Sequence, residues 1–419
     1  MDSYPSSPVG DRPRRRIPRA AELLPLLRPR RPHLDATRRR LATAADVTDL
    51  RVIARRRTPR AVFDYTDGGA GEELTLARNR AAFGRIEFRP SVLRDVSSVD
   101  TSASVLGEVS ALPIALGPTG FTRMMHHEGE TAVARAAAAH GVPYTLSTMG
   151  TTAAGPLAAA VPGVRRWFQL YLWRDRARSL DLVRGAAEAG YEALMLTVDT
   201  PVAGPRLRDV RNGMTIPPAL SARTLLDGAL RPWWWMNLLT TPPLEFASLS
   251  RWQGTVADLG NLMFDPGARA EDVAWLREVW PGKLIVKGVQ TAEDARMIAG
   301  LGVDALVVSN HGGRQLDRSP VPLEELPAVV RAVDGAAEVY LDGGVRSGAD
   351  AVAAVCMGAT AVLVGRAYLY GLMAGGEAGV NRTLDILSTE FRQTMQLLGA
   401  TSVGELTPDR VRLRDGSTR

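Results

Sequence analysis

The stretch ALVVSNHGGRQLD, from Ala305 to Asp317, places a histidine and an arginine on one turn after an apolar run. The apolar run predicts a short buried strand, and the glycines after His311 permit a sharp turn. Imidazole exchanges a proton near neutral pH, and the planar guanidinium of Arg314 fits a carboxylate. The pair suggests proton abstraction next to a carboxylate. Taken alone, the stretch is equally compatible with a surface loop whose polar groups only hydrogen-bond the turn.

Composition limits the kind of protein that carries this turn. The chain has 419 residues and 45% hydrophobic content, enough for a sizeable core in one large or two ordinary domains. We find no apolar run of about 18 residues that could span a bilayer, and no apolar signal-peptide core after the arginine-rich start. We therefore expect a cytoplasmic protein. The single cysteine, Cys356, excludes an internal disulfide and a cysteine-based metal cage, and we expect no metal site.

The net charge of +6 is concentrated early, in DRPRRR, LRPRRP, TRRRL and ARRRTPR. Such a basic arm can bind nucleic acid or an anionic membrane, but no aromatic residues interleave for base stacking, so we expect no nucleic-acid partner. Residues 1–42 lack sustained periodicity, which predicts a mostly disordered arm. The chain has only two lysines, and one of them, Lys287, ends an apolar segment.

After Leu112, short apolar segments that end in small or polar residues alternate with alanine-rich helical stretches. Most recur at roughly 20 to 35 residues, with intervening stretches long enough for crossover helices between parallel strands. The eight segments are LPIALGPTG, PYTLSTMG, RWFQLYL, ALMLTVDT, KLIVKG, ALVVSNHGG, EVYLDGG and AVLVGR. Eight units predict an α/β fold, a TIM (β/α)8 barrel. We place this domain at residues 43–405, with an N-terminal helical extension that begins in the helical pattern of residues 45–57, a long insertion after strand four and a C-terminal tail at 406–419. A doubly wound open sheet is the alternative.

The active site of a TIM barrel lies at the carboxyl ends of its strands, so the polar residues that end these segments should converge. They are Ser147, Gln169, Tyr171, Thr197, Asp199, Lys287, Ser309, His311 and Asp342.

Residues 201–272 interrupt the rhythm and predict an insertion on the catalytic face. They contain RPWWWMNLLTTPPLEF, with Trp233, Trp234 and Trp235 adjacent. Three consecutive tryptophans cannot all point into one core from a regular helix or strand, and tryptophan favours membrane–water boundaries. Contact with a membrane surface and packing in a lid or subunit interface both remain open.

The last two strands end in LDGGVRSGAD and LVGRAYLYG, where TIM barrels commonly bind phosphate through loop amides and a helix N-terminus. Gly343 and Gly344 permit close backbone approach, and Arg346 and Arg366 add positive charge. Lys287 belongs to the same ring of strand ends, where its ammonium group could stabilise negative charge on a reduced ring system. Redox chemistry without cysteine or metal ligands points to a flavin.

At this point the chain resembles the FMN-dependent 2-hydroxy-acid dehydrogenase and oxidase family. The resemblance covers residues 45–405 and rests on SNHGGRQLD, a highly specific signature, with FDYTDGGA, PTG, QLY, LTVDTPV, VKG, LDGGVRSG and GEAGV matching in order. Among members, the chain is most similar to respiratory, quinone-linked L-lactate dehydrogenases, through its arginine-rich start and tryptophan-bearing insertion.

The resemblance implies roles for individual residues. It implies that His311 is the active-site base and that Asp199 stabilises its imidazolium. Arg314 and Tyr65 would anchor the substrate carboxylate, Tyr171 would hydrogen-bond the substrate hydroxyl, Arg206 would be a mobile second arginine, and Lys287 would lie near flavin N1 and O2. The flavin would also contact Pro118, Thr119, Gly120, Ser147, Gln169, Thr197 and Ser309, and its ribityl phosphate would contact Asp342, Gly343, Gly344, Val345, Arg346, Gly365 and Arg366.

The resemblance further implies oxidation of an L-2-hydroxy acid, above all L-lactate to pyruvate. Electrons would pass to a quinone or another membrane acceptor, on the inner face of the cell membrane. The resemblance also implies that the protein forms a homotetramer or a larger assembly. The alternatives are an oxidase using O2, a mandelate-type dehydrogenase, and a flavoenzyme that matures a peptide-derived redox cofactor. Two positions bear on these: Gly120 stands where oxidases often have alanine, and Met149 where glycolate oxidase has tryptophan.

Overall fold

The computed structural model describes residues 16–23, 34–213, 228–247 and 263–414. Most of the predicted N-terminal arm, parts of the predicted insertion and the last five residues lie outside the described residues.

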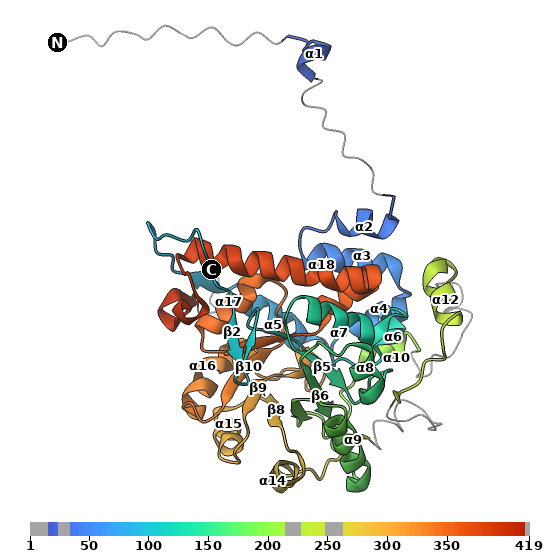
Figure 1. Cartoon of the computed structure of the whole chain (residues 1–419), viewed down its shortest axis with the longest axis vertical. Coiled ribbons are helices and arrows are strands. Elements are labelled where there is room, and N and C mark those ends of the chain that lie inside the picture. The colour runs from blue at the N-terminus through green and yellow to red at the C-terminus, as the bar shows by residue number, and fades with distance from the viewer. Residues whose placement is uncertain (1–15, 24–33, 214–227, 248–262, 415–419) are drawn as a thin grey trace, which may run out of the picture.

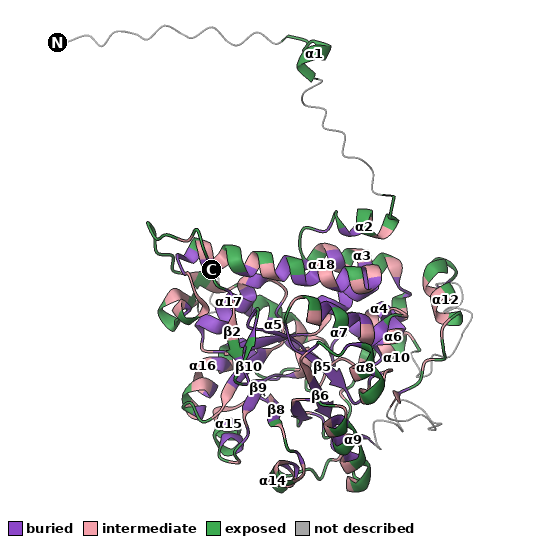
Figure 2. Cartoon of the chain, viewed as in Figure 1, coloured by how far each residue is buried: buried purple, intermediate pink, exposed green. Residues whose placement is uncertain are grey.

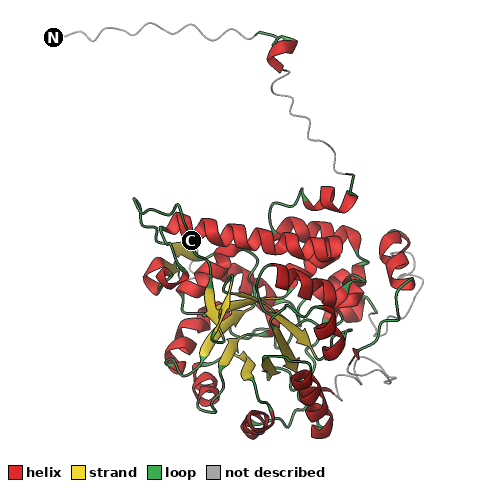
Figure 3. Cartoon of the chain, in the orientation of Figure 1, coloured by secondary structure: helices red, strands yellow, loops and turns green. Residues whose placement is uncertain are grey.

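Eight parallel strands close into a barrel (Figure 3), in the order β4-β5-β6-β7-β8-β9-β10-β11 with β11 paired to β4. The barrel strands are β4 (Ile114–Leu116), β5 (Tyr144–Ser147), β6 (Arg166–Leu170), β7 (Ala193–Thr197), β8 (Lys283–Val289), β9 (Ala305–Val308), β10 (Glu338–Asp342) and β11 (Ala361–Val364). Seven of them fall within the segments predicted from the sequence, and β8 extends one residue beyond KLIVKG, to Val289. The TIM barrel is confirmed, and the doubly wound alternative is wrong.

Helices cover the outside of the barrel and connect its strands (Figure 1). They are α7 (Gly129–Ala139), α8 (Ala154–Ala160), α9 (Arg176–Glu188), α14 (Ala270–Val279), α15 (Ala292–Ala299), α16 (Pro322–Val333), α17 (Gly348–Cys356) and α18 (Arg366–Leu398). Side-chain caps fix several starts: the Thr291 side chain accepts from the Asp294 amide at α15, and Ser347 forms a capping box with Asp350 at α17. Cys356 is buried at the end of α17.

The barrel interior explains why the strand ends carry the site. The interior core contains Trp167, Met195, Ile285, Val307 and Tyr340, one from each of five neighbouring strands. Side chains in a strand alternate between its two faces, so the next inward position is two residues further on. Those next positions are Gln169, Thr197, Lys287, Ser309 and Asp342. The same face of each strand therefore changes from apolar packing to polar chemistry at its carboxyl end (Figure 2 shows the strands buried).

The other end of the barrel is closed by the hairpin of β2 (Ala103–Val105) and β3 (Glu108–Ser110). Val105 and Leu106 pack into the interior core, and the guanidinium of Arg165 donates to the Val105 carbonyl at 2.9 Å. The hairpin plugs this end of the barrel, and the predicted site residues lie at the opposite, carboxyl ends of the strands.

Helices before the barrel pack against the long helix α18 (Figure 1). They are α2 (Ala36–Leu41), α3 (Val47–Arg57) and α4 (Arg60–Asp67). Helix α5 (Leu74–Phe83) instead packs against α16 and the turn at His311–Gly313, and the short α1 (Ala20–Leu23) lies apart from the others. Helix α18 is interrupted at Gly375 and at Gly376, which has a φ of 62°. Directly before this interruption, the Ala374 carbonyl accepts hydrogen bonds from the Arg40 guanidinium. The first barrel connection also contains α6 (Thr122–Met125).

The predicted tail contributes a strand, because β12 (Val411–Leu413) pairs antiparallel with β1 (Ile86–Phe88). Short 3-10 turns, η4 (Val403–Glu405) and η5 (Pro408–Arg410), lead into β12. Among the described residues, none of the helices combines the length and apolar character needed to cross a membrane.

Candidate active site

His311 stands in the turn η3 (His311–Gly313) directly beyond β9, with a left-handed backbone at φ of 57°. Its Nδ1 lies 3.0 Å from Oδ1 of Asp199, which follows β7. The absence of a side chain at Gly288 leaves room for Asp199 in this position, because a Cβ on residue 288 would lie 2.7 Å from the Asp199 Cβ. The structure thus brings together two residues that are 112 positions apart in the chain.

The carboxylate partner of His311 is held ionised. Burial alone would raise the pKa of Asp199, but His311 and Lys287 outweigh burial and keep the pKa below its ordinary value. An ionised Asp199 accepts a hydrogen bond from Nδ1–H, which leaves Nε2 of His311 free to accept a proton. Because His311 lines the central cavity, Nε2 can accept a proton from a molecule bound there.

Two arginines flank the ring of Tyr65, on helix α4. The guanidinium carbons of Arg314 and Arg206 lie 5.0 Å and 5.4 Å from the ring centroid. Arg314 also donates from Nη1 to the carbonyls of Tyr65 and Gly68, at 2.5 Å and 3.2 Å. Burial and the neighbouring Arg206 lower the pKa of Arg314. Two adjacent cations in one cavity make a site for an anion such as a carboxylate.

Tyr171 follows β6 and completes this side of the cavity. Burial and the charge of Asp199 raise the pKa of Tyr171 far above its ordinary value, so its phenol stays protonated. A protonated phenol donates a hydrogen bond to an oxygen of a bound molecule.

The arm that carries Arg206 is tied to the barrel. Arg206 pairs with Asp209 at 3.3 Å, and Arg208, in α10 (Leu207–Arg211), pairs with Asp67 at 3.1 Å and also with Glu73. The Gly204 amide donates to Gln315 at 3.0 Å. The described start of the insertion therefore lies over the turn that contains His311 and Arg314.

Lys287, at the floor of the cavity, belongs to a closed polar triangle. Its Nζ lies 3.0 Å from Oδ2 of Asp342 and 3.0 Å from Oγ of Ser309, and that hydroxyl donates to Oδ1 of Asp342 at 2.6 Å. Burial would lower the pKa of Lys287, but Asp342 and Asp199 raise it above its ordinary value. The buried ammonium therefore remains charged and faces the cavity that it lines.

A second chain of hydrogen bonds runs across three strands behind the cavity. Ser147 donates to Oε1 of Gln169 at 2.9 Å, and the Gln169 amide nitrogen donates to Thr197 at 3.0 Å. Because all three side chains are buried, their polar atoms are fixed in orientation.

Glycines and arginines form the far end of the cavity, after β10 and β11. Gly343 and Gly344 have φ of 96° and 93°, and a Cβ at Gly344 would lie 2.5 Å from the Asn79 carbonyl oxygen. The amide of Arg346 donates to Asp350 at 2.8 Å, and its guanidinium lies over the Tyr370 ring.

Arg366 differs from a simple phosphate ligand. Its three guanidinium nitrogens donate to the carbonyls of Thr66, Gly68 and Gly312 at 2.7 to 2.9 Å. Burial and the nearby Arg314 lower its pKa to about 10, so it remains charged at neutral pH. Arg366 thus joins the end of α4 to the His311 turn. Because its three nitrogens already donate to carbonyls, it would attract an anion mainly through its positive charge.

One cavity brings most predicted residues together. Those lining it are Tyr65, Pro118, Thr119, Gly120, Ser147, Tyr171, Arg206, Lys287, His311, Arg314, Asp342, Gly343, Gly344, Val345, Arg346, Gly365 and Arg366. Gln169, Thr197, Asp199 and Ser309 lie directly behind it and hydrogen-bond or ion-pair with each other or with lining residues.

Other lining residues were not predicted, among them Arg80 and Met125. Arg80 donates to the carbonyl of Gly344 and to Asp350, both at 2.6 Å. It lies inside helix α5, in LTLARNRAAF, where no local motif distinguishes it from the many other arginines.

Gly120 and Met149, the two positions that vary within the resembling family, are in contact. A Cβ on Gly120 would lie 2.7 Å from the Met149 Cβ. The residue types at these two cavity positions are therefore coupled, because alanine at position 120 requires Met149 to move.

A family model, related sequences and a solved structure all indicate the same protein family. Residues 54–413 match the family model described as FMN-dependent dehydrogenase. A Mycobacterium tuberculosis protein named provisionally as an L-lactate dehydrogenase is 57% identical over 397 residues, 95% of this chain and 96% of that protein. An L-lactate dehydrogenase of Caulobacter vibrioides is 44% identical and covers 86% of this chain and 96% of its own.

A solved structure of a monotopic membrane protein, (S)-mandelate dehydrogenase, superposes with a TM-score of 0.85 at 37% identity and covers 88% of this chain and all of that one.

The cavity fits the flavin mononucleotide that the family implies. The glycine turn after β10 lines the cavity, and Arg346, Arg366 and Arg80 gather positive charge beside it, where a phosphate dianion would need it. Lys287 provides a buried cation at the floor, beside the polar atoms of Ser147 and Asp342. The chain belongs to the FMN-dependent dehydrogenase family and is an FMN-dependent oxidoreductase acting on the CH–OH group of a 2-hydroxy acid.

Proposed function

We propose that this enzyme oxidises L-lactate to pyruvate and passes the electrons to a membrane quinone. The observation that carries the first half is the His311–Asp199 pair beside the two arginines, inside the cavity that fits FMN. The L-lactate dehydrogenase names of the relatives at 57% and 44% identity support L-lactate as the hydroxy acid. Reduction of the bound flavin by L-lactate in the absence of oxygen tests this choice.

We assign the following roles within that cavity. Arg314 and Arg206 bind the substrate carboxylate, and the protonated phenol of Tyr171 donates to the substrate hydroxyl oxygen. Nε2 of His311 accepts the proton that leaves the substrate, and ionised Asp199 stabilises the imidazolium that forms. Bound FMN supplies the two-electron oxidant. Lys287, Asp342 and the glycine turn would hold it, with the Lys287 ammonium stabilising negative charge on its reduced ring.

(S)-Mandelate is a second candidate substrate. Two solved relatives are named for it: the (S)-mandelate dehydrogenase and a mandelate oxidase with a TM-score of 0.77 at 41% identity. Comparing kcat/KM for the two acids with a dye acceptor decides between them.

The quinone assignment rests on the insertion, whose helix α12 (Pro232–Leu239) lies at the periphery of the molecule (Figure 1). Trp233, Met236 and Leu239 follow one side of this helix and are 58%, 55% and 73% exposed. Trp234 instead donates from its indole to the Met124 carbonyl at 2.9 Å, and it packs edge-on against Trp235. An exposed apolar side with an anchored opposite side suits a helix that lies in the plane of a membrane interface. The solved (S)-mandelate dehydrogenase is named as monotopic, which supports this placement.

We expect that replacing Trp233, Met236 and Leu239 together with serine lowers binding to liposomes by at least about tenfold, because each serine removes apolar area from the interface. Reduction of FMN by L-lactate should be unchanged. Cosedimentation with liposomes measures the first and stopped-flow absorbance the second. Trp234 and Trp235 stay, since they attach α12 to the enzyme.

A matched control replaces two exposed apolar residues elsewhere, Val92 and Leu397, with serine. Equal losses in the control and the α12 variant would argue against a membrane-facing helix. Dissociation of the tetramer or larger assembly that we propose from family resemblance, with membrane binding retained, would instead make α12 a subunit interface.

A further inference from the structure

A second cavity lies beside the one that fits the flavin, and one residue borders both. Met125, at the end of α6, lines the flavin cavity and also the second cavity, which has a volume of about 540 Å3, within the range of small-molecule sites. The second cavity is formed between α2, α3, α6, α12 and the broken part of α18. A molecule bound there and a molecule in the flavin cavity would both neighbour Met125, which places the two sites side by side for electron transfer.

The wall of this cavity towards solvent is helix α12. Trp233 and Trp234 both line it, and Trp233 is also one of the exposed apolar residues of α12. The cavity therefore opens beside the surface that we assign to the membrane. Met373 adds a further apolar wall from α18. A flat apolar ring with a hydrocarbon tail would be in contact with protein inside and with lipid outside.

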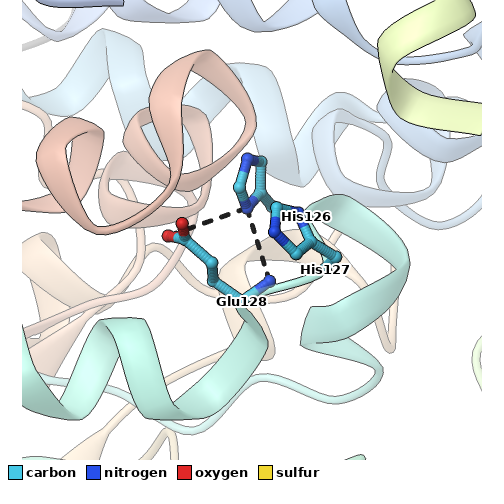
Figure 4. A group of neighbouring side chains, drawn as sticks. All are labelled: His126, His127 and Glu128. Carbon is cyan, nitrogen blue, oxygen red and sulfur yellow. Dashed lines mark hydrogen bonds and ion pairs between the residues drawn. The ribbon is translucent and has the colours of Figure 1, made fainter. Parts of the chain in front are cut away.

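The polar wall consists of His126, His127 and Glu128, shown in Figure 4. The Glu128 amide donates to Nδ1 of His126 at 3.4 Å, and the Glu128 carboxylate accepts from the Glu377 amide at 2.7 Å. With Nδ1 of His126 accepting, its ring proton is on Nε2, which is the donor it offers a ligand. Nδ1 of His127 is buried and has no hydrogen-bond partner among the described residues.

Three neighbouring ligand-type side chains raise the question of a metal ion, but the surroundings disfavour a cation. Arg40 and Arg57 line the same cavity. Burial, His127, Arg57 and Arg40 together outweigh Glu128 and lower the pKa of His126 to about 4. His126 is therefore neutral at physiological pH, and the two arginines place positive charge where a cation would have to bind. Within the described part of the chain, the Arg57 guanidinium makes no hydrogen bond or ion pair, so its donors remain available to an oxygen acceptor in the cavity.

We propose that this second cavity binds the head group of the quinone that accepts electrons from the flavin. The inference rests on the proposed function, because it names the site of the acceptor. His126 Nε2–H and the Arg57 guanidinium donate to the quinone oxygens, Trp234 and Met373 contact the ring, and the tail leaves past Trp233 into lipid.

The redox step balances without another reactant. Oxidation of the hydroxy acid to the 2-oxo acid releases two electrons and two protons, and the electrons are held by the reduced flavin. The quinone takes up two electrons and two protons to become a quinol, and the flavin returns to its oxidised form. One proton reaches a quinone oxygen from His126 Nε2, and the imidazole is then reprotonated from solvent, to which 19% of its side chain is exposed. The second proton enters from solvent at the cavity mouth.

The test uses the holoenzyme and a water-soluble quinone with a single isoprenoid unit. We expect that Arg57→Met and His126→Asn each raise the KM for this quinone by about tenfold to a hundredfold, the loss typical of a hydrogen bond from a charged or buried donor. Reduction of the flavin by L-lactate and turnover with ferricyanide should be unchanged. Arg56→Met and His140→Asn are the matched controls: Arg56 is exposed one position away on α3, and His140 lies outside both cavities.

A binding readout that needs no turnover accompanies the kinetics. An azido derivative of the same quinone, photolysed on the oxidised holoenzyme, should label peptides from α6, α12 or residues 373–375. Arg57→Met should lower this labelling about tenfold to a hundredfold at a quinone concentration below the native Kd. Labelling of the flavin cavity alone, or unchanged quinone KM in both variants, overturns the proposal. The proposal is also overturned if the two variants lose quinone reduction only when anionic liposomes are present, because the cavity would then bind a lipid head group and not the quinone. If L-lactate fails to reduce the flavin, the proposed substrate is wrong, while labelling still decides the quinone site.

Discussion

Replacing His311 with glutamine should slow reduction of the bound flavin by L-lactate by a factor of about 10² to 10⁴, the usual contribution of a general base. Glutamine can still hydrogen-bond to Asp199, 3.0 Å away in the native pair, but it has no group that accepts a proton near neutral pH. The measurement is the single-turnover rate of flavin bleaching in a stopped-flow instrument. Bound FMN per protein should stay the same, because the polar contacts of the cavity floor come from Lys287, Ser309 and Asp342.

His140→Gln is the control for this prediction, since His140 pairs only loosely with Asp385, at 3.8 Å, outside the cavity. It should reduce flavin at the native rate. Near-native reduction in the His311 variant would remove His311 from the role of base, and the proton would have to leave through another group.

Arg314→Lys should lower kcat/KM for L-lactate by about 10² to 10⁴, although the substitution keeps the positive charge. Arg314 donates to the carbonyls of Tyr65 and Gly68 while its guanidinium also faces the cavity. A lysine ammonium is a point charge that cannot present the same planar fork. Loss of about two charge-assisted hydrogen bonds at roughly 1.5 to 3 kcal/mol each gives the expected range.

Arg318→Lys provides the comparison within the same loop, because Arg318 is an exposed arginine that pairs with exposed Glu72 at 3.0 Å. Its kcat/KM should match the native value. If Arg314→Lys also matched it, the substrate carboxylate would have to bind elsewhere, with Arg206 as the first candidate.

The barrel could be predicted because its signal is local. Each strand is a short apolar segment followed by a polar or glycine residue, and alternation along the strand then decides which residue faces the axis. Ile285 and Lys287, or Val307 and Ser309, illustrate this: one is in the interior core, and the other is in the polar layer two residues later. The convergence of the strand-end residues follows from closure of the barrel alone.

Features that depend on contacts distant in sequence could not be predicted. Arg366 stands in a glycine–arginine pattern that suggests phosphate binding, yet its guanidinium binds carbonyls from α4 and from the His311 turn. Arg80 reaches the cavity from a helix outside the barrel. Nothing local to either residue specifies these partners, because tertiary packing creates them.

The insertion shows a mixed outcome. The tryptophan run correctly indicated side chains that cannot share one environment, since Trp233 is exposed and Trp234 is attached to α6. The second cavity behind Met125 was not predicted, because its walls come from five separate helices.

The most direct test of the account is the spectrum of the purified holoenzyme before and after anaerobic addition of L-lactate. We expect the visible absorbance of oxidised FMN to bleach, with one pyruvate formed per flavin, and to return when quinone is added. A spectrum that L-lactate leaves unchanged, in protein that holds FMN and retains its fold, would contradict the proposal that this cavity oxidises L-lactate.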